Sequence, residues 1–250
     1  MALLRTESVD GLLIVRQEDG RANTIGAAWL NAIEGLLDAL GDSRGLVISG
    51  SGRFFSTGLD LVEVHALDRA AMTAFINRFD DLLLRLMTLP MPTVAAINGH
   101  AVAGGLLVAL ACDVRLAAAG DYRIGINTLA LGIPLPMVGL LAVKRAIAPD
   151  KQHRVLAEGV MLDPQAAAEL GLARLAKGDL IEEAVATVLH LSRSPGAYAL
   201  LKQHLLDPHL EYLADHRKAV NDDFIEAWFT TEAIRRREDA LEELGNNDVE

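Results

Sequence analysis

The chain has 250 residues and a mass of 26.8 kDa, which is enough for one sizeable hydrophobic core. Hydrophobic residues make up 51% of it and the mean hydropathy is +0.26, which excludes a disordered chain. Acidic residues (34) outnumber basic ones (23), and the net charge of −11 argues against nucleic acid and anionic membranes as partners. The single cysteine, Cys112, excludes a disulfide framework and a cysteine-based zinc site.

The sequence also argues against export and membrane insertion. Charged residues at Arg5, Glu7 and Asp10 come too early for the apolar region of a signal peptide. The longest apolar stretches are shorter than the ~18 residues that a membrane-spanning helix needs. We therefore expect a cytoplasmic protein. The seven histidines are scattered, and we predict no metal site.

In the first half of the chain, short β-branched runs alternate with helical patterns. We predict strands at 12–15, 45–50, 93–97 and 114–118 and helices at 28–40, 68–89 and 103–111. The last of these helices is apolar on all sides, as in a buried helix. Strands that alternate with helices predict an α/β fold with largely parallel pairing.

After Pro134 helical patterns dominate. We predict helices at 140–148, 164–170, 180–191, 195–206 and 210–244, the last with a possible break near Thr230. The domains are expected to be an α/β core over residues 1–195 and a C-terminal helical region over 196–250. Apolar residues at Ile225, Trp228 and Phe229 offer a surface for self-association.

Two glycine-centred segments are candidates for a functional site. Residues 52–61 follow a predicted strand, and residues 98–105 lie between a strand and the start of the buried helix. A helix N-terminus presents unpaired N–H groups, and glycine lets a ligand approach them closely. Two such N–H groups from separate loops could hold one developing oxyanion. From the residues alone, glycine at a strand-to-helix turn more often serves close packing than catalysis.

These segments resemble the paired signatures of the crotonase (enoyl-CoA hydratase/isomerase) superfamily. Residues 53–61 are similar to its K-x-F-x-x-G-x-D-L/I pattern, and residues 96–105 are similar to its A-x-N-G-x-A-x-G-G-G/C pattern. Three further blocks match in the right order, at 112–115, 124–134 and 163–173. The resemblance covers about residues 10–240.

The resemblance implies a fold, a ligand and an assembly. The fold is a crotonase-like spiral of ββα units followed by the C-terminal helical region, assembled as trimers or dimers of trimers. The ligand is an acyl-CoA thioester, with coenzyme A as part of the substrate and no separate cofactor. The implied oxyanion hole consists of the backbone N–H groups of Leu59 and Gly104, which stabilise a thioester enolate.

The resemblance also implies further substrate-binding positions. Arg21 and Arg53 stand where basic residues of the family often meet CoA phosphates, although each could be an ordinary surface charge. The remaining positions are close to the two amides in the sequence; they are Gly58, Asp60, Leu61 and Gly105. Asp60 is interpreted first as a helix cap or turn former, rather than as a base.

The sequence departs from the family pattern at both catalytic glutamates. Leu107 and Thr128 stand at these two positions, and neither side chain can replace a carboxylic acid near pH 7. Efficient hydration is therefore not expected. Other acids do not obviously substitute for them: Asp80 and Asp81 are interpreted as the solvated face of a long helix. The other positions considered are His65, His100 and Pro136, interpreted as a surface histidine, a packing residue and a proline where other members place a carboxylate.

Three functions remain open. The first is a divergent acyl-CoA enzyme of the hydratase/isomerase family. The second is a different thioester reaction, either hydrolysis or decarboxylation, the latter forming an enolate without a protein base. The third is noncatalytic acyl-CoA binding.

Overall fold

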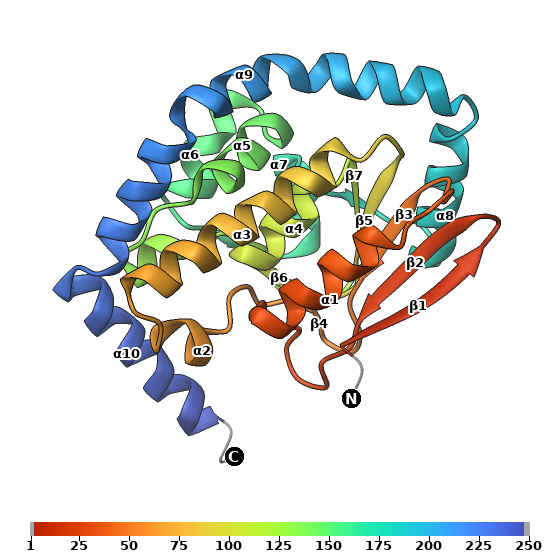
Figure 1. Ribbon diagram of the computed structural model, residues 1–250. Helices are drawn as coiled ribbons and strands as arrows, with labels where there is room; N and C mark the ends of the chain where they lie inside the picture. The colour runs from red at the N-terminus through yellow and green to blue at the C-terminus, as the bar shows by residue number, and fades with distance from the viewer. Residues whose placement is uncertain (1–2, 248–250) are drawn as a thin grey trace.

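The computed structural model describes residues 3–247, which form two β-sheets covered by helices (Figure 1). The larger sheet has six strands in the order β1 (Leu4–Val9), β2 (Leu12–Gln17), β3 (Leu46–Ser49), β5 (Thr93–Ile97), β7 (Val114–Ala117) and β10 (Arg174–Leu175). The smaller sheet has the order β4 (Phe54–Ser56), β6 (His100–Val102), β8 (Ile124–Gly125) and β9 (Met161–Leu162). All neighbours are parallel except β1–β2 and β8–β9, which confirms the predicted α/β class.

Successive ββα units build the two sheets together. In three consecutive units, the first strand (β3, β5 or β7) joins the larger sheet and the second (β4, β6 or β8) joins the smaller one. The helices are α1 (Ala27–Asp38), α2 (Leu61–His65), α3 (Arg69–Thr88), α4 (Gly104–Ala111), the 3₁₀ helix η1 (Thr128–Leu131), α5 (Met137–Ala146), α6 (Pro149–Leu156), α7 (Pro164–Leu170), α8 (Leu180–Leu191), α9 (Pro195–Trp228) and α10 (Thr231–Asn247). This is the spiral that the resemblance implied.

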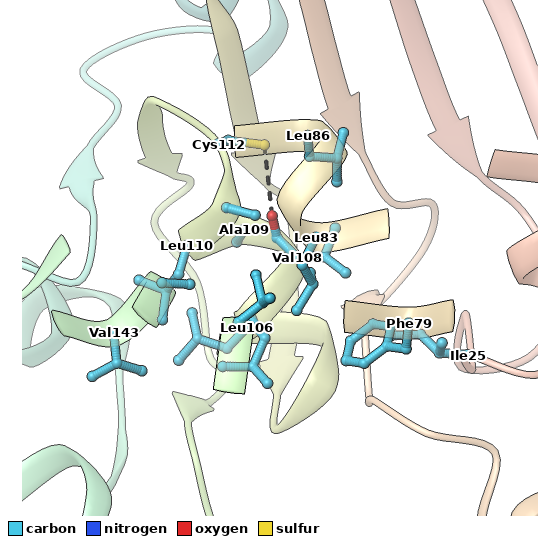
Figure 2. Packing of buried hydrophobic residues seen from close by; sticks show 14 of the residues in the cluster. Ile25, Phe79, Leu83, Leu86, Leu106, Val108, Ala109, Leu110, Cys112 and Val143 are labelled. Carbon is cyan, nitrogen blue, oxygen red and sulfur yellow. Dashed lines mark hydrogen bonds between the residues drawn. The ribbon is translucent and has the colours of Figure 1, made fainter. Parts of the chain in front are cut away.

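The strands of the larger sheet are buried on both faces, as parallel strands between helices require. Leu46 and Ile48 of β3 face the main core under α1, α3 and α4, whereas Val47 faces a second core under α8. All eight residues of α4 are buried, which explains its uniformly apolar sequence. Figure 2 shows α4 side chains, among them Leu106 and Leu110, packed within the main core.

Helix α9 corrects one prediction. We expected two helices separated near Pro208, but a single helix of 34 residues runs through this proline. A proline inside a helix costs a hydrogen bond and clashes with the preceding turn. Here Leu206 and Leu213, on either side of it, are both buried, so packing holds the helix together. The expected break near Thr230 is confirmed, because α9 ends at Trp228 and α10 begins at Thr231.

The apolar residues near this break do not form the expected surface. Ile225 and Trp228 are buried in the chain's own core, and Phe229 is half-buried beneath the guanidinium group of Arg69. Ile225 and Trp228 are therefore not available to a partner subunit. The division into domains at residue 195 stays a prediction. No helix within residues 3–247 has the length and apolar composition needed to cross a bilayer.

Candidate active site

Two backbone amides from different ββα units converge at the centre of the site. The loop after β4 brings Leu59 beside Gly104, the first residue of α4. A Cβ atom added to Gly104 would lie 3.5 Å from the nitrogen of Leu59. Within residues 3–247 neither N–H group donates to a backbone carbonyl or a side chain. The sequence placed both residues in one site, and the structure brings them together.

Local backbone geometry explains why these two amides are free. Ile25 donates to the carbonyl oxygen of Gly58 over 2.8 Å and accepts from the amide of Asp60 over 3.0 Å, so the pairing skips Leu59. Gly104 lies in the first turn of α4, where an N–H group has no intrahelical acceptor. Ala103, just before the helix, has φ +47°, a conformation rare outside glycine.

Glycines allow the close approach of these loops. Gly58 has φ +92°, and a Cβ atom there would lie 2.9 Å from the nitrogen of Gly104. A Cβ atom on Gly105 would collide with the carbonyl oxygen of Ser56, so Gly105 lets α4 pack against β4. The same glycine-rich segments therefore allow close packing and leave two amides unbonded. The packing interpretation and the oxyanion interpretation of these segments do not exclude each other.

Asp60 caps helix α2. Its carboxylate accepts a hydrogen bond from the amide of Glu63 over 3.1 Å and another from the hydroxyl of Thr24 over 3.2 Å. This confirms Asp60 as a structural cap. Leu61 is the first residue of the capped helix and is half-buried. Their contact with substrate stays a prediction.

The two positions of the family glutamates lie on different elements. Leu107 is one turn after Gly104, is 2% exposed, and its side chain packs against Gly139 of α5. Thr128 begins η1 and is half-buried, and its hydroxyl makes no hydrogen bond within the described part of the chain. Helix α10 holds η1 in place, because Arg236 donates to the carbonyl oxygen of Ala130 over 3.2 Å.

The structure overturns the prediction that Asp80 is solvated. Its side chain is fully buried and caps α5 by accepting a hydrogen bond from the amide of Val138 over 3.1 Å. Asn221 of α9 donates to it over 3.0 Å, and Arg217 lies 3.7 Å away. Burial raises the pKa of Asp80, and these donors oppose the shift. Asp81 does lie on the exposed face, paired with Arg217 over 2.7 Å.

Because Asp80 joins three helices, its loss is expected to destabilise the fold. Asp80→Ala leaves the amide of Val138 without its acceptor and removes one of the two acceptors of the Asn221 side chain, which costs about 1–3 kcal/mol. The matched variant Asp81→Ala removes only an exposed ion pair, worth about 0–1 kcal/mol. Urea unfolding of both variants measures the difference. Equal losses of stability would contradict this structural role.

Neither histidine nor Pro136 supplies an evident acid. His100 packs with its ring centroid 5.4 Å from that of Phe54, and burial lowers its pKa. His65 ends α2 half-buried, and its Nδ1 is buried without a hydrogen-bond partner in the described residues. Pro136 precedes α5 as its N-cap residue.

The two candidate CoA-binding arginines are exposed. The backbone amide of Arg21 donates to Asp19 over 2.7 Å, and the carbonyl oxygen of Arg53 accepts from the amide of His100 over 2.9 Å. Neither guanidinium group forms an ion pair with a carboxylate in the described part of the chain. Both charges are therefore free to meet an anion.

The ββα spiral, with two neighbouring amides that make no hydrogen bond in the described residues, defines a protein of the crotonase fold class. A family model described as "Enoyl-CoA hydratase/isomerase" matches residues 10–245, and the chain belongs to this family and is an enzyme of it. A protein of Bacillus subtilis (strain 168) named "Probable enoyl-CoA hydratase" is 31% identical over 192 residues, which are 74% of each chain.

Other relatives carry isomerase names. "Enoyl-CoA delta isomerase 1, mitochondrial" of Mus musculus is 31% identical over 175 residues, which are 68% of this chain and 61% of the mouse protein. The crystal structure of human mitochondrial delta3-delta2-enoyl-CoA isomerase superposes with a TM-score of 0.91 and 25% identity. It covers 98% of this chain, and this chain covers 99% of it. The comparisons thus include relatives named for both reactions.

Proposed function

We propose that this enzyme binds acyl-CoA thioesters and stabilises an enolate of the thioester with the backbone N–H groups of Leu59 and Gly104. The convergence of two amides without acceptors carries the proposal. Preorganised N–H groups stabilise negative charge as it develops on an oxygen, and the positive end of the α4 dipole adds to this effect. Arg21 and Arg53 supply positive charge for the phosphates of CoA, and no metal or separate cofactor takes part.

The reaction that we propose is not an efficient hydration of the substrate. Addition of water needs positioned acids or bases, but Leu107 and Thr128 stand at the two glutamate positions. Asp80, a buried carboxylate of α3, accepts hydrogen bonds from the amide of Val138 and the side chain of Asn221 and so acts as a helix cap. We place the enzyme among the acyl-CoA isomerases and lyases of the family, in the cytoplasm.

We expect the wild-type enzyme to hydrate crotonyl-CoA poorly. A missing acid or base typically costs 10²–10⁴ in rate. Mass spectrometry of the products from a panel of acyl-CoA esters distinguishes water gained, CO₂ lost, CoA released and isomerisation without a mass change. Rapid gain of water by crotonyl-CoA would contradict the proposal. Binding without turnover of any ester would also contradict it and would favour noncatalytic acyl-CoA binding.

We also propose assembly as a homotrimer or a dimer of trimers. Helix α9 exposes Leu201 (60%) and Leu205 (68%), which are four residues apart and therefore lie on one face. Exposed large apolar side chains grouped on one face are typical of protein interfaces.

The double variant with Leu201→Glu and Leu205→Glu is expected to dissociate the assembly, because it places two charges in the buried interface. Sedimentation at micromolar concentration measures the change. Gln203→Glu, on the same helix, adds a charge outside this stripe and should leave the assembly intact. A wild-type protein that sediments as a monomer would contradict the proposed assembly.

A further inference from the structure

Helix α10 closes over two segments that border the candidate active site. Its residue Ala233 packs against Gly132 at the end of η1, the 3₁₀ helix that begins at Thr128. Helix α10 also packs against α2, which begins directly after Leu59 and Asp60. Figure 1 shows α10 beside α2, folded back from the end of α9. Arg237, one turn after Ala233, lies on the same inward face of α10 and is only 2% exposed.

The guanidinium group of Arg237 is stacked on Trp228, the last residue of α9. Its Cζ atom lies 3.9 Å from the centroid of the indole ring, and its Nη1 donates to the Trp228 carbonyl oxygen over 2.9 Å. Two donors of this stacked pair are buried without any acceptor in the described residues: Nε of Arg237 and Nε1 of Trp228. Buried donors are almost always satisfied, so an acceptor is missing here.

Arg237 also lacks an anionic partner for its charge. No carboxylate in residues 3–244 forms an ion pair with Arg237. Elsewhere in the chain, the buried Lys202 lies 2.8 Å from Asp113, and Arg145 lies 3.6 Å from the same carboxylate. A buried cation without an anion is destabilising, and stacking on an indole ring offsets this cost only in part. Burial accordingly lowers the pKa of Arg237.

We propose that Arg237 and Trp228 bind a carboxylate at the far end of the acyl group, so that the substrate is the CoA thioester of a dicarboxylic acid. This inference rests on the proposed function. A carboxylate has two oxygens and accepts several hydrogen bonds, so it can take both the Nε–H of Arg237 and the Nε1–H of Trp228. It also neutralises the buried charge. Because α10 packs against both η1 and α2, which border the candidate site, we place the path of the acyl chain between these two segments.

The test compares esters that differ only in the terminal group. Calorimetry measures binding of saturated acyl-CoA esters of four to ten carbons, each as a dioyl ester and as the methyl-terminated ester of equal length. We expect one length at which the dioyl ester binds about 10- to 100-fold more tightly, since charged hydrogen bonds contribute this much. Arg237→Met should remove this preference, so that the dioyl ester and the methyl-terminated ester of that length bind with equal affinity.

Two further variants separate recognition from folding. Arg235→Met changes an exposed arginine on the outward face of α10 and should keep the preference. Trp228→Phe keeps an aromatic ring beneath the guanidinium group but removes the indole N–H, so it should reduce the preference several-fold. This variant and the wild-type comparison still decide the question if Arg237→Met does not fold.

The outcomes distinguish this inference from the function on which it rests. If both ester types bind with equal affinity at every length, acyl-CoA binding stands and the carboxylate site is wrong. A preference that persists in Arg237→Met also overturns the site. If neither ester type binds, both the proposed function and the inference are wrong.

Discussion

Gly104→Ala is expected to lower turnover of the preferred acyl-CoA by about 10²–10³, the typical effect of removing one oxyanion contact. The added methyl group would lie 3.5 Å from the nitrogen of Leu59, beside the amide of Gly104 itself. A thioester oxygen cannot then approach both N–H groups. Steady-state kinetics of the wild-type and variant enzymes measure the effect.

The substitution is suited to this test because it does not disturb the surrounding backbone. The nearest atoms to the added methyl group are 3.4–3.5 Å away, which is ordinary van der Waals contact, and Gly104 has no positive φ. Gly35→Ala in α1 is the matched control, since a Cβ atom there meets nothing within 4 Å. Unchanged turnover in a folded Gly104→Ala protein would show that these amides do not hold the reacting oxygen.

The sequence predicts the parts of the fold that repeat a pattern over many residues. The strand at 93–97 and the apolar helix after it are correct almost to the residue, because burial on all sides leaves a continuous apolar run. Strands β8, β9 and β10 have two residues each, too few to show any periodicity. Their pairing depends on neighbours that are distant in sequence.

The residues of the candidate site also divide into those that the sequence reveals and those that it does not. Gly58 and Gly105 are recognisable because the close approach of two segments demands glycine at those positions. The burial of Asp80 is not recognisable, because its partners Val138 and Asn221 are 58 and 141 residues away. Nor does the sequence distinguish Trp228 facing its own core from Trp228 facing a partner, since an amphipathic helix looks the same in both cases.

Arg237 is a further residue that sequence reasoning missed. Its spacing of four residues from Ala233 places both on one face of α10, but an arginine in a charged helix is normally exposed. Only the structure shows that this face is covered. The lack of an anionic partner for Arg237 depends on the contacts between α9 and α10, which the sequence does not reveal.

Thr128→Glu is expected to raise double-bond isomerisation of a 3-enoyl-CoA by about 10²–10⁴, the usual contribution of a positioned acid or base. Isomerisation needs only one group that removes and returns a proton. Position 128 is half-buried, and partial desolvation raises the pKa of a carboxyl group toward neutrality, which favours proton transfer in both directions. Conversion followed by liquid chromatography measures the gain.

The control is Thr128→Gln, which has nearly the same shape as the glutamate variant and no titratable group; it should gain nothing. Adding Leu107→Glu should introduce hydration of crotonyl-CoA, at a cost in stability, because Leu107 is only 2% exposed and packs against Gly139. The single Thr128→Glu variant is thus the cleaner test. If unmodified enzyme hydrates crotonyl-CoA rapidly and Thr128→Ala does not slow it, the acid lies at a position outside those considered, and the two family glutamate positions do not determine the chemistry of this enzyme.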